Sequence, residues 1–150
     1  MRIAAVLVLA FTTAMPAAAK AAPAEELFRQ FNLFGIWAPD CGQAASPANP
    51  HVSITTPSPG LVLESHDLGR NYAVNRYSML SAERLSGERL AVEVIFQPGT
   101  ADEERQKLVF LIRKDTRRTL FNQPEGGAVR VKDGIALARG SKTPVLHKCE

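Results

Sequence analysis

The chain has few of the residues that usually carry chemistry. Its 150 residues include only two Cys, three His and one Trp. No Cys-x-x-Cys pair occurs, and no two His stand four residues apart, so the ligand spacing of a zinc site is missing. Glycine-rich phosphate loops and the Gly-x-Ser-x-Gly turn of hydrolases are also absent. We therefore expect no metal, no cofactor and no catalytic activity.

Strong charge of one sign is missing too. Lys and Arg number 18 against 15 Asp and Glu. Two of the basic residues, Arg2 and Lys20, lie within residues 1–21, and without them 16 basic residues face 15 acidic ones. The basic residues form no block and are not interleaved with aromatics, which make up 7% of the chain. The sequence thus predicts no nucleic-acid partner.

The longest apolar run is too short to span a membrane. It covers residues 3–14, follows the basic Arg2, and precedes a proline and several alanines. A spanning helix needs about 20 apolar residues, so this pattern indicates a secretory signal peptide. We expect residues 1–21 to be removed, with a cut after Ala19 as the alternative. Residues 22–150 would then form one domain without a membrane span, located in the periplasm or secreted.

The two cysteines both lie in the predicted mature part. Thiols pair in the oxidising compartments that exported proteins reach. We therefore predict a disulfide between Cys41 and Cys149, which would close almost the whole domain into one loop. A catalytic thiol or a metal site is the alternative interpretation.

Helical periodicity is confined to the start of this domain. Large apolar residues recur at spacings of three and four over residues 24–34, after two acidic residues, which predicts a short amphipathic helix ended by Gly35. The Pro-, Gly- and Ala-rich stretch 38–50 predicts an irregular loop.

Short apolar runs separated by turn residues follow, and they indicate antiparallel strands. The run 72–82 would keep its large residues on one face if a bulge lay near Asn75. In the last hairpin, a three-residue loop from Lys132 to Gly134 would pair Val131 with Ile135 and keep apolar residues together. The predicted strands fall within residues 52–56, 61–66, 72–82, 90–96, 108–112, 116–121, 129–137 (two strands) and 145–147.

This count of about eight strands, joined by hairpin-length connections and preceded by one helix, predicts a mainly β domain. An antiparallel meander of that size can close into a barrel, which removes its exposed edges. An open β-sandwich is the alternative.

Gly35-x-Trp37, placed between a short helix and a strand meander, resembles the opening of lipocalin and wider calycin barrels. The resemblance implies a closed barrel with Trp37 packed across its closed end. A similar opening occurs in small periplasmic inhibitors of bacterial metalloproteases. Residues 37–41, with Pro47 and Pro50, also resemble a group of small exported alphaproteobacterial proteins of unknown function. The prolines up to Pro50 depart from the calycin pattern and would leave the first strand very short.

Seven large side chains are candidates to line a pocket for an apolar ligand. These are Trp37, Tyr72, Tyr77, Met79, Phe96, Phe110 and Phe121. The same residues could instead fill the core, because side-chain volume decides whether a small barrel is hollow.

The remaining polar residues are expected to be solvated. Strand alternation places His66 on the face of Val62 and Glu64, where a surface or interface histidine is the simplest interpretation and a metal ligand the alternative. The pair Arg117 and Arg118 is expected to be exposed charge.

These observations favour an exported binding module for an apolar small molecule or a protein partner. An inhibitor-like protein that acts through the segment before Leu27 is the alternative. An enzyme would require a cluster that strand spacing does not provide, such as Asp40, His51 and His147 brought together by the fold.

Overall fold

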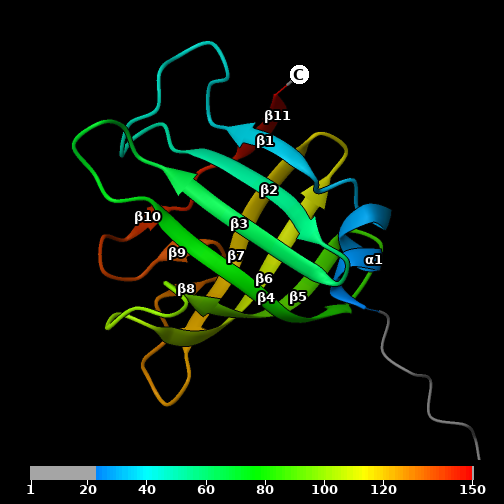
Figure 1. Ribbon diagram of the computed structural model, residues 1–150. Helices are drawn as coiled ribbons and strands as arrows, with labels where there is room; N and C mark the ends of the chain where they lie inside the picture. Colours follow the sequence, from blue (N-terminus) through cyan, green and yellow to red (C-terminus); the bar gives the residue numbers. More distant parts are fainter. Residues whose placement is uncertain (1–22, 150) are drawn as a thin grey trace, which may run out of the picture.

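Eight antiparallel strands close into a barrel, and a short helix lies at one end of it (Figure 1). The computed structural model describes residues 23–149, so the expected signal peptide and its cleavage site lie outside the described residues. Within this range no helix is long and apolar enough to cross a membrane. The barrel strands are β1 (Gly35–Ala38), β2 (His51–Ser58), β3 (Leu61–Asp67), β4 (Asn75–Arg84), β5 (Arg89–Phe96), β6 (Glu104–Arg113), β7 (Thr116–Pro124) and β11 (Leu146–Cys149).

Closure of the barrel depends on the last strand. Consecutive strands pair from β1 to β7, and β11 lies between β7 and β1, so every barrel strand has two neighbours. The predicted closed meander is confirmed, and the open sandwich is excluded. The strand β1 has only four residues before the proline-rich loop, as the prolines indicated.

The helix α1 (Ala24–Gln30) and the turn after it fill one end of the barrel. The prediction of a helix up to Phe34 was too long, because the chain leaves helical geometry at Asn32, whose φ is +54°. Leu27 and Phe28 are buried in the core. Trp37, which is completely buried, donates its indole N–H to the carbonyl of Leu33 at 2.8 Å. This end of the barrel is therefore solidly packed.

The run around residue 75 differs from its prediction. The strand β4 begins at Asn75, and its bulge lies between Met79 and Ser81. Tyr72 belongs to the preceding loop and is 56% exposed. The predicted bulge near Asn75 was wrong because residues 72–74 make no strand pairs, so no common face had to be maintained there.

Three short strands form a side sheet next to β7: β8 (Val131–Lys132), β9 (Ile135–Ala136) and β10 (Ser141–Lys142). The β8–β9 hairpin pairs Val131 with Ala136, so its loop has two residues and the predicted three-residue loop was wrong. Asp133 and Gly134 both have positive φ, as a type I′ turn requires. The prediction assumed one buried face, whereas none of the four paired residues of this hairpin is fully buried.

The predicted disulfide is confirmed. Cys41 and Cys149 are bonded, with their Cα atoms 5.6 Å apart and 108 positions apart in the sequence. The bond joins the loop after β1 to the end of β11, the strand that closes the barrel. It therefore fastens the closure covalently.

Candidate functional site

A cavity of about 420 Å³ occupies the barrel at the end away from α1. The helix end is identified by two contacts, from Glu25 to the backbone of Gly60 and from Arg84 to Gln30. The cavity residues lie near the opposite strand ends. Its apolar walls are formed by Val52, Met79, Val94, Phe96, Leu108, Phe110 and Leu146. The barrel is thus filled at one end and hollow at the other.

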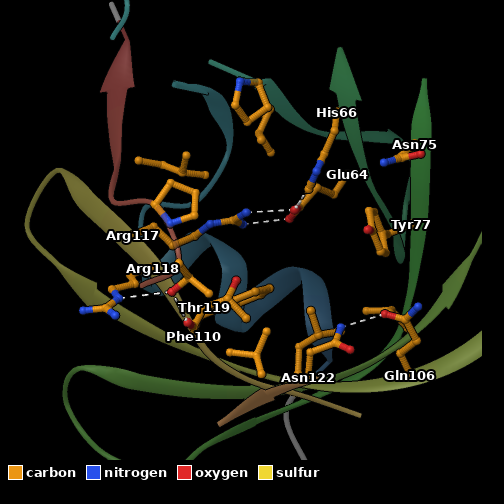
Figure 2. Close-up of a pocket in the computed structure, with 18 of the residues that line it drawn as sticks. Glu64, His66, Asn75, Tyr77, Gln106, Phe110, Arg117, Arg118, Thr119 and Asn122 are labelled. Carbon is orange, nitrogen blue, oxygen red and sulfur yellow. Dashed lines mark hydrogen bonds and ion pairs between the residues drawn. The ribbon is translucent and has the colours of Figure 1, made fainter. Parts of the chain in front are cut away.

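A buried ion pair crosses the interior between β3 and β7 (Figure 2). The Nη1 and Nη2 atoms of Arg117 donate to the two carboxylate oxygens of Glu64 at 2.7 and 2.8 Å. Both side chains are buried, and the guanidinium lies 4.5 Å from the ring centre of Phe110. His66 contacts the same carboxylate, with its Nε2 atom 2.6 Å from Oε1. The carboxylate is therefore surrounded by nitrogen atoms.

These contacts determine the ionisation of Glu64. Burial by itself would raise the pKa of the carboxyl group, but the charge and hydrogen bonds of Arg117, together with the hydrogen bond from His66, outweigh it. The pKa of Glu64 is consequently held well below its usual value. The carboxylate stays charged at neutral pH, and its charge is compensated within the protein.

Sequence reasoning missed this pair, although part of the signal was present. Alternation along β3 already placed Glu64 on the face of Val62, which is buried. The expectation of solvated charge was wrong for Arg117, because its partner in the β6–β7 register is the inward-facing Ile112. His66, expected at the surface, lines the cavity and is half-buried.

Tyr77 presents its hydroxyl to the cavity (Figure 2). Its ring packs between His66 and Phe96, at centroid distances of 5.0 and 5.1 Å. Burial, reinforced by the negative charge of Glu64, raises the pKa of Tyr77 to about 12. No residue in the range 23–149 forms a hydrogen bond with this hydroxyl. It therefore remains protonated at neutral pH and free to bond to a ligand.

A chain of polar groups links β6 and β7 to Arg130. Arg130 forms a bidentate pair with Glu104 at 2.7 and 2.8 Å. Gln106 donates to the same carboxylate at 2.6 Å, and Asn122 donates to Oε1 of Gln106 at 2.8 Å. The Oδ1 atom of Asn122 is buried and has no hydrogen-bond partner among the described residues. An uncompensated buried acceptor of this kind is uncommon in folded proteins.

The structure brings four of the seven candidate lining residues together. Tyr77, Met79, Phe96 and Phe110 line the cavity. Trp37 lies beneath it in the packed core, and Tyr72 is exposed in a loop. Phe121 borders a second hollow, of about 400 Å³, and is paired with Val109 rather than with an inward-facing residue of β6.

Asp40, His51 and His147, the residues considered for an enzyme, are not linked by hydrogen bonds in the described part of the chain. The Asp40 carboxylate accepts hydrogen bonds from the backbone of Gly42 and the side chain of Gln43, so it stabilises the turn that it begins. A ring nitrogen of His51 lies 2.8 Å from the carbonyl oxygen of Gln43. Across residues 23–149, no group of three or more acidic, His or Cys side chains could hold a metal ion.

The segment named for the inhibitor alternative is partly described. Ala24–Glu26 form the first turn of α1, where the Glu25 carboxylate accepts bonds from Arg29 at 2.6 Å and from the backbone of Gly60 at 2.7 Å. Residue 22 lies outside the described range. Inhibition through this segment, like a protein partner, stays a prediction.

Comparisons with protein-family models, curated proteins and solved structures give no match. Function is therefore inferred from the chemistry of the cavity.

Proposed function

We propose that the protein is a non-catalytic binding module that holds a small, mainly apolar molecule in its barrel. The observation that carries this proposal is the cavity of about 420 Å³. Small-ligand sites have volumes of roughly 300–1,000 Å³ and combine apolar walls with a few polar groups. Here the aromatic and aliphatic walls supply the contact surface, and Tyr77 supplies a hydroxyl that has no hydrogen-bond partner among residues 23–149.

The rigidity of the barrel supports the same function. Its strands pair without a free edge, α1 fills one end, and the disulfide fastens the closing strand. A preformed site loses less conformational entropy when a ligand binds. The lipocalin-like Gly35-x-Trp37 opening and the closed barrel are also consistent with a container for a small molecule.

We place this activity outside the cytoplasm, in the periplasm or the secreted fraction. The Cys41–Cys149 disulfide supports this location, because such bonds persist in oxidising compartments. The signal-peptide pattern of residues 1–21 supports the same location.

Pyrene is a suitable probe, because it is apolar, has no hydrogen-bonding group, and reports the polarity around it in its emission spectrum. We expect saturable binding with an emission typical of an apolar site. Val94 is buried in β5 and lines the cavity, so Val94→Phe should fill the space and abolish binding. Ile95 is the next residue of the strand and faces the other side, so Ile95→Phe is the matched control.

Thermal unfolding of both variants would show that they remain folded. Absence of pyrene binding by the wild-type protein would overturn the proposal. Equal binding by wild type and Val94→Phe would place the probe elsewhere and also count against it.

A further inference from the structure

The charged groups inside the barrel already have partners. Glu64 is paired with Arg117, and Arg130 is paired with Glu104. Arg118 uses its guanidinium to hold the side sheet, donating to the carbonyl of Gly134. Of the cavity-lining arginines, Arg139 alone has no acidic or carbonyl partner among residues 23–149, and it is solvent-exposed. The deep part of the cavity therefore offers no free cation to a buried anion.

Besides the exposed Arg139, uncharged groups of the lining also lack partners among residues 23–149. The Tyr77 hydroxyl points into the cavity, and burial keeps its pKa high enough for it to remain a donor. Oδ1 of Asn122 is a buried acceptor without a donor in the same range. Its orientation follows from the polar chain described above. A carboxylate can only accept, so Gln106 must turn its NH₂ group toward Glu104 and its oxygen toward Asn122.

The hydrogen bond to Gln106 also determines which amide atom of Asn122 is left without a partner. Because its NH₂ group donates to the oxygen of Gln106, the remaining atom, Oδ1, is an acceptor. A buried acceptor without a donor costs free energy. Because Oδ1 is fully enclosed, no group in the cavity reaches it in this structure. The Tyr77 hydroxyl is the uncharged donor that points into the cavity.

We propose that the ligand is an uncharged amphipathic alcohol whose hydroxyl is bound by Tyr77. A hydroxyl suits this site, since its oxygen can accept the hydrogen bond that the Tyr77 hydroxyl donates. The apolar body of the ligand packs against the walls formed by residues such as Met79, Leu108 and Phe110. This inference rests on the proposed function and adds the chemical class of the ligand.

A carboxylate ligand is disfavoured by the same observations. It would lose its hydration on entering the barrel, and the nearest buried cation, Arg117, is already bonded twice to Glu64. Burying an unpaired charge is far more costly than burying a hydroxyl that forms a hydrogen bond. The cavity should therefore discriminate between an alcohol and an acid of equal chain length.

The test uses 1-decanol and decanoate as competitors for bound pyrene at neutral pH. We expect 1-decanol to displace pyrene at a concentration at least about ten-fold lower than decanoate does. Tyr77→Phe removes only the hydroxyl, so 1-decanol should bind about five- to ten-fold more weakly while pyrene binds as before. Tyr72 is exposed in a loop, and Tyr72→Phe is the matched control that should change neither.

Equal or tighter binding of decanoate would overturn the inference, as would full 1-decanol affinity in Tyr77→Phe. In both cases retained pyrene binding would leave the proposed function standing. If pyrene itself did not bind, both the proposed function and the inference about the ligand would be overturned.

Discussion

Replacing Arg117 with leucine should be among the most damaging single changes in this protein. The guanidinium is 3% exposed and supplies two of the three hydrogen bonds to the Glu64 carboxylate. Arg117→Leu keeps an apolar side chain over Phe110 but leaves a negative charge in the barrel with only His66 beside it. The variant therefore isolates the consequence of an uncompensated buried charge.

The expected loss of unfolding free energy is about 3–5 kcal/mol at pH 7, the usual effect of breaking a buried pair. Domains of this size are stable by only about 5–15 kcal/mol, so the change should be obvious in urea denaturation. Replacing both partners, as in Glu64→Leu with Arg117→Leu, should cost much less, because no charge is then left in the apolar interior. The double variant thus separates the cost of an isolated charge from a general loss of packing.

The contribution of Glu64 to the free energy of unfolding should change with pH in opposite directions in the wild type and in Arg117→Leu. In the wild type the folded-state pKa of Glu64 lies below its unfolded value, so the pair stabilises the fold above that unfolded value, and the contribution is lost as the pH falls through the folded-state pKa. In Arg117→Leu, burial should raise the pKa of the carboxyl group instead. The destabilisation should then shrink as the pH is lowered and the carboxyl group becomes neutral.

Urea titrations of the wild type, both single variants and the double variant at pH 7 and pH 4 would test this reasoning. A loss below about 1 kcal/mol for Arg117→Leu, or an equal loss at the two pH values, would refute it. A double variant as unstable as Arg117→Leu would also refute the reasoning.

Three further predictions concern the rest of the fold. Alkylation of Cys41 and Cys149 should add no mass without reductant, and replacing both with serine should lower the unfolding free energy by about 2–5 kcal/mol in urea. Gly134→Ala should cost about 1–3 kcal/mol by thermal unfolding, because φ is +74° and the new methyl group would overlap the guanidinium of Arg118. The folded-state pKa of Tyr77 is raised to about 12, so the stability it contributes should be present below about pH 10 and lost as the pH rises toward 12.

For each of these three predictions, one experimental outcome would contradict it. Two added alkyl groups on the unreduced protein would exclude the disulfide. Gly126 has a similar φ of +69°, but no atom lies within 4 Å of the position that a new methyl group would take, so an equal loss in Gly126→Ala would show that Arg118 plays no part. Tyr77→Phe should remove the loss of stability at alkaline pH, measured by urea titration between pH 9 and 12. An unchanged profile would assign that loss to another group.

Local patterns were informative where one face of an element is buried. Alternation in residues 90–96 predicted β5, and the spacing of Leu27 and Phe28 predicted the buried face of α1. The pattern failed where no buried face exists, in the hairpin around Gly134 and in the loop that holds Tyr72. In such segments, turn chemistry and long-range contacts determine the structure instead of alternation.

The sequence could predict some of the residues that line the cavity but not the cavity itself. Large residues such as Tyr77 and Phe110 were identifiable as candidates from the apolar runs, but an empty volume depends on how the side chains of all eight strands meet. The pairing of Glu64 with Arg117 joins residues 53 positions apart. Alternation places Glu64 on the face of the buried Val62, but nothing local in either segment identifies its partner.

The sequence by itself determined the strand-rich class, the short helix and the partner of each cysteine, because these follow from periodicity, turn residues and a count of two thiols. Only the tertiary structure decided that the barrel is hollow at one end, that Arg117 is buried and that Oδ1 of Asn122 has no donor among residues 23–149. Those properties arise from contacts across the barrel between distant segments, where barrel closure sets the distances and the polar groups must find partners away from water.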